Sequence, residues 1–298
     1  MMRILLFLGT NLAIMLVLGV VLSVLGVGNY MQAGGGINLT SLLIFCGVFG
    51  MGGSLISLML SKWMAKKSMG VQIIDQPQNA GEQWIVSTVK ELADKAGIGM
   101  PEVGIFHSDA PNAFATGASK NNALVAVSTG LLQRMDKEQV KAVLGHEIGH
   151  IANGDMVTLA LMQGVLNTFV MFFARIIVSV IDSFTRDENG EGGLGFLARM
   201  GITIVMDMLL GILASMMVAW FSRRREYRAD QAGAELVSPA AMAGALAALK
   251  QTYDQPSDLQ GELVAFGIRG EGGGLSALMA SHPPLDDRIN ALKQRYGN

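Results

Sequence analysis

The sequence predicts an α-helical integral membrane protein with about four transmembrane helices and an α+β domain outside the membrane. Hydrophobic residues make up 51% of the 298 residues and charged residues only 15%. The mean hydropathy is +0.41, which lies on the apolar side of ordinary soluble domains. No charged residue occurs between Arg3 and Lys62, and short β-like runs follow in the more polar part of the chain.

The first two predicted spans are the apolar runs at residues 4–27 and 38–61. Each is long enough to cross about 30 Å of hydrocarbon as a helix. A cleavable signal peptide is the alternative for the first run. Its apolar region is about twice the usual length and no convincing small-residue cleavage site follows, so a retained anchor is favoured.

The third and fourth predicted spans, residues 157–181 and 197–221, each contain a charged residue, Arg175 and Asp207. A lone charge inside hydrocarbon costs about 2.5 to 3.5 kcal/mol, so each needs a partner. At about 1.5 Å per residue, both lie at nearly the same depth below the connecting loop of an antiparallel hairpin. An ion pair between them is therefore expected. The alternatives are a polar cavity around these charges, or shallower spans.

The distribution of basic residues predicts the orientation. Lysines follow the second span and four arginines follow the fourth, whereas the loop at 28–37 is uncharged and the loop at 182–196 is mostly acidic and glycine. The positive-inside rule then places both polar segments in the cytoplasm, where together they are long enough for one compact domain. The predicted parts are 1–61 (spans one and two), 62–156 (first cytoplasmic part), 157–221 (transmembrane hairpin) and 222–298 (second cytoplasmic part).

Two function classes are disfavoured by composition. Cys46 is the only cysteine, so no disulfide can form within the chain, and its place inside a predicted span gives a thiol nucleophile neither a base nor water. The net charge of −2 does not suggest a nucleic-acid binder.

The first cytoplasmic part begins with a helix at residues 84–96, which ends at a glycine- and proline-containing segment. The runs "EVGIFHS", "NAFATG" and "ALVAVST" follow as short strands, and "ASKNN" between the last two predicts a hairpin turn. Asp136 and Gln139 then form the capping-box pattern of a helix start, and Asn153-Gly154 marks its end.

This last predicted helix contains "HEIGH". Residues four apart share one face of a helix, so His146 and His150 can bind a single ion, and Glu147 on the adjoining face can reach a water held by that ion. This is the HExxH arrangement of zinc proteases. The alternative is coincidence, since such a pattern arises by chance on the order of a few times per thousand sequences of this length.

A third ligand can come from "SRRREYRADQAGAELV". Glu226 and Asp230 are again four apart on a helical segment, so one carboxylate could bind metal while the other hydrogen-bonds a ligating histidine. The alternative is a solvated face on which both acids pair with the surrounding arginines. His107 and His282 are poorer candidates, because neither has a second ligand at helical spacing.

HEIGH at 146–150, EYRAD at 226–230 and "SHPPLDDRI" at 281–289, set among four apolar spans, resemble the HtpX-type membrane zinc metalloproteases, relatives of the CAAX prenyl endopeptidases. The resemblance implies a zincin-like (gluzincin) protease domain with one Zn²⁺ per chain. It implies a bacterial inner-membrane endopeptidase with a cytoplasmic site, induced under envelope or heat stress, that cuts misfolded or damaged membrane proteins. The roles it implies are metal ligands at His146, His150 and Glu226, a catalytic Glu147, a supporting Asp230, and further site residues His282 and Arg288.

Two roles are assigned from chemistry. His282 is the candidate donor to the oxyanion that develops during peptide hydrolysis, and the substrate backbone is expected to lie along an edge strand formed by Asn112, Ala113, Phe114 and Ala115. An ordinary hairpin strand is the alternative for "NAFA". Arg288 either pairs with a carboxylate of the site or caps the last helix.

Two other classes of protein combine spans with histidines and carboxylates. A metal transporter places its ligands near the middle of the bilayer, whereas the candidate ligands here flank the spans. An inactive scaffold would have lost a ligand or the catalytic glutamate, and this chain keeps all four. The expected partners are the lipid bilayer and unfolded or membrane-protein substrates; the sequence leaves the individual substrates and the oligomeric state open.

Overall fold

A computed structural model describes residues 14, 16–24, 37–186, 192–254 and 278–297. The chain divides into two compact units. The first is formed by Met1–Ser57 with Ala160–Val218, and the second by Leu58–Leu159 with Ala219–Asn298. The predicted first span, at residues 4–27, lies for the most part outside the described residues.

Three helical segments of the described residues are long and apolar enough to cross a membrane. The first, Leu39–Met69, runs without a break through α2 (Leu39–Gly47), the π-helical turn η1 (Val48–Gly52) and α3 (Gly53–Met69). The others are α7 (Asp155–Phe184) and α8 (Phe196–Leu236). They coincide with the second, third and fourth predicted spans, and all three extend beyond them.

Small residues bring the helices of the first unit close together. A Cβ atom added to Gly50 of η1 would collide with Thr168 of α7, and one added to Gly164 would meet Met51. The Ser54 hydroxyl donates a hydrogen bond to the carbonyl of Ala160. Close backbone approach at small residues is the usual way in which helices associate in a membrane.

The predicted ion pair of the hairpin is present in the first unit. Arg175 Nη1 lies 3.6 Å from Asp207 Oδ1. Arg175 also donates to the carbonyl of Met171 at 2.9 Å, and its guanidinium carbon lies 5.8 Å from the centre of the Phe45 ring. Asp207 Oδ1 is buried without a hydrogen-bond partner.

The loop end of the same hairpin is fastened by Asp182, whose side chain is 2% exposed. Its carboxylate is 2.8 Å from Arg186 and 2.8 Å from Arg199, and it accepts a hydrogen bond from the backbone N–H of Leu194 at 2.7 Å. One acid therefore connects both helices of the hairpin through the segment that joins them.

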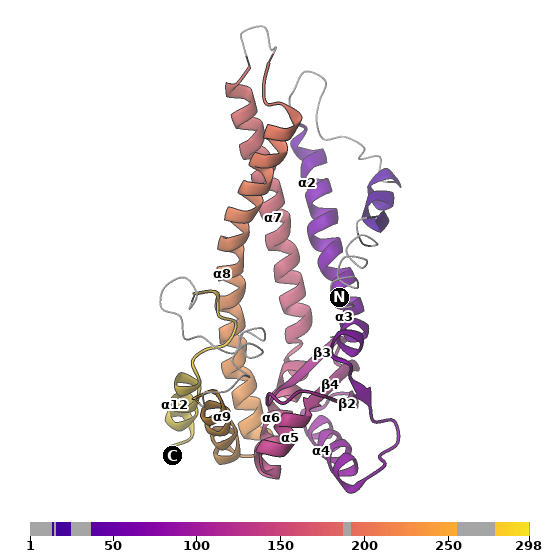
Figure 1. The fold of residues 1–298 in the computed structure, drawn as a ribbon, viewed down its shortest axis with the longest axis vertical. Helices are drawn as coiled ribbons and strands as arrows, with labels where there is room; N and C mark the ends of the chain where they lie inside the picture. Colours follow the sequence, from indigo (N-terminus) through magenta and orange to yellow (C-terminus); the bar gives the residue numbers. More distant parts are fainter. Residues whose placement is uncertain (1–13, 15, 25–36, 187–191, 255–277, 298) are drawn as a thin grey trace. The chain divides into compact units, whose positions relative to one another are not determined.

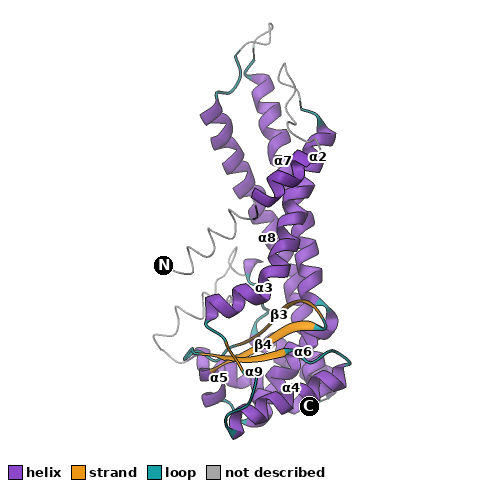
Figure 2. Ribbon diagram, turned by 90° about the vertical axis from the view of Figure 1, so that its right-hand side faces the viewer, coloured by secondary structure: helices purple, strands orange, loops and turns teal. Residues whose placement is uncertain are grey.

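The second unit contains a four-stranded sheet with the order β1-β2-β4-β3. Figure 2 shows its strands in orange, with β3 and β4 side by side. Strand β4 pairs with β2 in parallel and with β3 antiparallel, and β1 pairs antiparallel with β2. The strands are β1 (Gln72–Ile73), β2 (Glu102–Phe106), β3 (Ala113–Ser119) and β4 (Asn122–Ser128). The three strands predicted from the sequence are confirmed, and β3 lies at an edge.

The predicted hairpin joins β3 to β4 through Lys120 and Asn121. Near the turn, Gly117 has a φ of 144°, and a Cβ atom there would collide with the backbone of Asn122. A register shift between Gly117 and Ser119 follows directly. Glycine permits both the unusual conformation and the close approach of the partner strand.

Helices pack around this sheet to form the core of the second unit. Buried side chains from α4, α6 and β4, among them Val89, Leu144 and Val125, share one hydrophobic cluster. Helix α9 contacts both α6 and α12, and Figure 1 shows α9 and α12 side by side. The helices are α4 (Ala80–Ala96), α5 (Thr129–Arg134), α6 (Lys137–Asn153), α9 (Pro239–Asp254), α12 (Leu285–Tyr296) and the last turns of α8.

The ends of α6 follow the predicted signals. Asp136 accepts a hydrogen bond from the backbone of Gln139, whose side chain accepts one in return from the backbone of Asp136, so the capping box is complete. Gly154, with a φ of 68°, ends the helix in the left-handed conformation. Helix α4 begins four residues earlier than predicted, because the Asn79 side chain caps it by accepting from the backbone of Glu82.

Candidate metal centre

Glycines in the HEIGH segment allow α6 and α8 to approach closely within the second unit. A Cβ atom added to Gly149 would lie 2.6 Å from the Cβ of Ala232, and one added to Gly145 would lie 3.2 Å from the Cα of Gly233. This contact brings the α8 residue Glu226 up to the two histidines of α6.

His146, His150 and Glu226 form a group whose potential ligand atoms all lie within 4.8 Å of one another. His146 Nε2 is 3.5 Å from one Glu226 carboxylate oxygen, and His150 Nε2 is 3.3 Å from the other. Two imidazoles and one carboxylate are a donor set that catalytic zinc uses in proteins. The residues present therefore fit a zinc ion.

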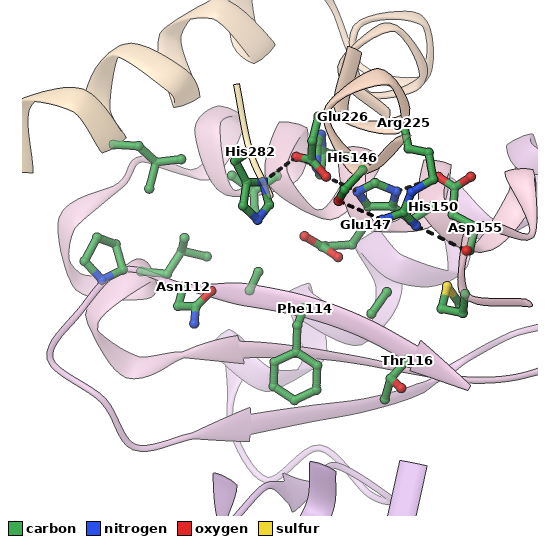
Figure 3. Close-up of a pocket in the computed structure, with 18 of the residues that line it drawn as sticks. Asn112, Phe114, Thr116, His146, Glu147, His150, Asp155, Arg225, Glu226 and His282 are labelled. Carbon is green, nitrogen blue, oxygen red and sulfur yellow. Dashed lines mark hydrogen bonds and ion pairs between the residues drawn. The ribbon is translucent and has the colours of Figure 1, made fainter. Parts of the chain in front are cut away.

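Each histidine is held through its other ring nitrogen. His146 Nδ1 is 3.0 Å from Asp230 Oδ1, and His150 Nδ1 is 2.7 Å from Asp155 Oδ2 (Figure 3). If both Nδ1 atoms carry the proton and donate it to these carboxylates, both Nε2 atoms are free to bind a metal. The position of Asp230 fits the supporting role expected for it.

Asp155 was not singled out by the sequence. The signal was nevertheless present: an acid directly after the Asn153-Gly154 helix stop, five residues beyond His150. Because Gly154 separates α6 from α7, the helical spacing rule that links His146 to His150 does not extend to Asp155.

Arg288 binds Asp230 through two hydrogen bonds, from Nε at 2.8 Å and from Nη2 at 2.6 Å. Its Nη1 atom is 3.4 Å from Glu226 Oε2. Of the two alternatives for Arg288, this geometry favours pairing with site carboxylates. Burial lowers the pKa of Arg288, but Asp230, Glu226 and Glu147 outweigh burial and raise it above its ordinary value.

Asp230 and Glu226 also change the pKa of His146. Burial lowers the pKa of His146, but the hydrogen bonds and charges of Asp230 and Glu226 outweigh burial and raise the pKa from 6.5 to about 10. A metal ion would therefore compete with a proton for this imidazole.

A cavity of about 550 Å³ adjoins the group within the second unit. The Glu147 carboxylate lies in it between the histidines and β3 (Figure 3). His282 also borders the cavity, 32% exposed, and its Nδ1 atom is 2.8 Å from Glu226 Oε2. The predicted substrate-binding residues Asn112, Ala113, Phe114 and Ala115 all line it, whereas His107 does not.

Arg225, one of the four arginines after the fourth span, also contributes to the cavity beside the candidate metal centre. Arg225 is 7% exposed and borders the cavity. It donates to the backbone carbonyl of Asp155 at 3.1 Å and to the Ser222 hydroxyl at 3.0 Å. The sequence indicated only a topology signal at this position.

Known proteins are similar to this chain in sequence and in fold. The model of Peptidase family M48 matches residues 79–296. Protease HtpX of Chromohalobacter salexigens is 60% identical over 296 residues, which cover 99% of this chain and 98% of that protein. Protease HtpX of Pseudomonas putida (strain GB-1) is 57% identical over 298 residues, which cover 99% and 100%.

A solved structure shares the fold at lower identity. The crystal structure of S. mikatae Ste24p superposes with a TM-score of 0.60 at 19% identity, over 84% of this chain and 58% of that one. Family, relatives and apolar helices agree with one another: the chain belongs to Peptidase family M48 and is a membrane metallopeptidase.

Proposed function

We propose that this protein is a zinc-dependent endopeptidase of the bacterial inner membrane, whose site faces the cytoplasm and cleaves misfolded or damaged membrane proteins under envelope or heat stress. The observation that carries the proposal is the His146, His150 and Glu226 group beside Glu147, in one cavity with an edge strand. Protease HtpX relatives of nearly equal length support the reaction class.

The proposed architecture has about four transmembrane helices around a zincin-like (gluzincin) cytoplasmic domain. Its parts are 1–61, 62–156, 157–221 and 222–298, as expected from the sequence. Lysines at the end of α3 and arginines in the last part of α8 support the cytoplasmic side by the positive-inside rule.

One Zn²⁺ per chain is proposed at His146, His150 and Glu226. When bound, zinc would supply a Lewis acid for the scissile carbonyl and would lower the pKa of a water from about 15.7 toward about 7. Asp230 holds His146 in the orientation that this site needs, and Arg288 holds Asp230.

Glu147 is the proposed general base and acid. Glu147 is 9% exposed and its carboxylate faces the cavity, so it can accept the proton of the attacking water and deliver it to the leaving amine. His282 is the proposed oxyanion donor. Because its Nδ1 atom contacts Glu226, it can donate from Nε2 only if both ring nitrogens carry protons or if Glu226 releases Nδ1.

The outer edge of β3 is the proposed substrate track. Ser128 N–H donates to the Asn112 carbonyl at 2.8 Å, which makes this a hydrogen-bonded pair of the ladder. Such pairs alternate along an antiparallel ladder, so Ala113 and Ala115 turn their backbone groups away from β4. No strand of the described residues pairs with that edge.

An added substrate strand would be recognised mainly through its backbone, which tolerates many sequences. Part of the cavity lining is apolar, with Leu131, Val143, Met242 and Leu246. This lining suits the apolar side chains that an unfolded membrane protein exposes.

The test is cleavage of an unfolded model protein by the purified full-length chain in detergent. Chelation should abolish cleavage and zinc should restore it, while Glu147→Gln should retain zinc and lose cleavage. Glu138→Gln, an exposed acid on the same helix, is the matched control and should remain active. Cleavage that persists in Glu147→Gln would refute the mechanism, and equal cleavage of folded and misassembled membrane proteins would refute the quality-control role.

A further inference from the structure

We infer that Asp155 is a positioning residue for His150, and that together with Arg225 it fixes the second histidine relative to Glu226. The inference rests on the proposed zinc site. Asp155 is 1% exposed, and its Oδ2 atom is 2.7 Å from His150 Nδ1. A carboxylate that accepts this N–H fixes the tautomer in which Nε2 is unprotonated, and it limits rotation of the ring.

The chain path explains how Asp155 reaches the histidine. Gly154 ends α6 in the left-handed conformation, with a φ of 68°, and Asp155 is the first residue of α7. The Thr158 backbone and hydroxyl both donate to the Gly154 carbonyl, at 3.1 Å each, which fastens the start of α7. A single residue between two helices thus directs the Asp155 carboxylate back toward the last turn of α6.

Asp155 is in turn held from α8. The Arg225 Nη1 atom donates to its backbone carbonyl at 3.1 Å, and Arg228 Nη2 lies 3.7 Å from its Oδ1 atom. Arg225 directly precedes Glu226 in the chain. The hydrogen bond from Arg225 to Asp155 therefore connects the start of α7, which contacts His150, to the part of α8 that carries Glu226.

The arrangement repeats, on different elements, the one around the first histidine. His146 Nδ1 contacts Asp230, which Arg288 holds. His150 Nδ1 contacts Asp155, which Arg225 holds. Each imidazole is supported by a buried aspartate; Arg288 binds the carboxylate of Asp230, whereas Arg225 binds the backbone carbonyl of Asp155.

A purely structural reading is that Asp155 only stabilises the start of α7, where an acid interacts favourably with the helix dipole. The two interpretations predict different effects of an Asp155 substitution on zinc affinity. A positioning residue affects the affinity for the ion, whereas a helix-start residue stabilises the zinc-loaded and zinc-free proteins equally.

The experiment measures zinc affinity of the full-length protein in detergent, by competition with a chelator of known affinity. Asp155→Asn preserves the shape of the side chain but removes its charge, and it should weaken zinc binding by about 10-fold to 100-fold. Asp136→Asn is the matched control: it also alters an acid at a helix start, asparagine caps helices equally well, and Asp136 contacts no candidate ligand. Its zinc affinity should be unchanged.

Thermal unfolding with zinc and with excess chelator keeps the test decisive if Asp155→Asn is less stable. The gain in melting temperature on adding a limiting concentration of zinc should shrink in this variant, because stabilisation by a ligand follows its affinity. Zinc affinity equal to that of the wild type, or an equal fall of both melting temperatures, would overturn the inference alone. A wild-type protein without chelatable zinc would overturn the proposed centre and this inference with it.

Discussion

In the unit that carries the candidate metal centre, Asp230 is held by two hydrogen bonds from Arg288, at 2.8 and 2.6 Å. In the helical unit, Arg175 and Asp207 approach only to 3.6 Å, and the buried Asp207 Oδ1 atom has no hydrogen-bond partner. Both regions place oppositely charged side chains next to each other. Directed hydrogen bonds join the two partners only in the first region.

The difference indicates two uses of buried charge. Around the histidines both Nδ1 atoms and the Asp230 carboxylate have defined hydrogen-bond partners, which hold these groups in one geometry before a metal or substrate arrives. In the hairpin the pair mainly offsets the cost of placing charge in an apolar helix pair. Removing a member of the first set should therefore change function, whereas removing one from the second should change stability.

The largest effect on zinc binding is expected at Glu226, because its carboxylate contacts both candidate histidine ligands as well as His282 and Arg288. Glu226→Ala should lose zinc almost entirely, because it removes a proposed ligand. Asp230→Ala should retain a site that binds zinc roughly 10-fold to 100-fold more weakly, since it removes only the support of His146. Zinc content after dialysis measures both. Equal zinc in the wild type and in Glu226→Ala would refute the ligand assignment.

Substitution of the partly exposed His282 tests whether the hydrogen-bonded groups around the candidate metal centre include this histidine. As a donor to the developing oxyanion it should affect turnover, so His282→Ala should lower the rate by about 100-fold to 1000-fold with zinc content intact. Peptidase rates and zinc analysis on the same preparation provide the comparison. Loss of zinc would instead assign His282 to holding Glu226, which its 2.8 Å contact with that carboxylate also permits.

The smallest effect is expected for the loose pair in the hairpin. Arg175→Leu and Asp207→Leu should each lower the melting temperature, because each leaves one uncompensated charge. The double variant, or the charge-swapped pair, should recover at least part of the loss. A double variant as damaged as the sum of the two single ones would show that the residues do not interact.

Local signals in the sequence predicted much of the fold. The capping box at Asp136, the left-handed Gly154 and the β3–β4 turn depend on neighbours within a few residues, so they can be read from the sequence directly. The pairing of Arg175 with Asp207 followed from the regular rise of a helix. The continuity of α8 from its apolar part to Glu226 was not predicted, since its two halves differ in character.

The contacts that complete the centre could not be predicted in the same way. Arg288 lies 58 residues from Asp230, and only folding brings α12 to α8. Asp155 is near His150 in sequence, but a turn through Gly154 determines its direction, and the spacing does not reveal that turn. Helical periodicity identifies pairs on one face of one helix, and it contains no information about a second element.

The order of the candidate ligands along the chain has a consequence for biosynthesis. His146 and His150 leave the ribosome first, Glu226 follows only after α7 and the apolar part of α8, and Arg288 comes close to the end. A nascent chain cannot assemble the three-residue group until both helices of the hairpin have been synthesised. Nascent chains that stop before Glu226 therefore lack the proposed zinc site and, with it, the proposed peptidase activity.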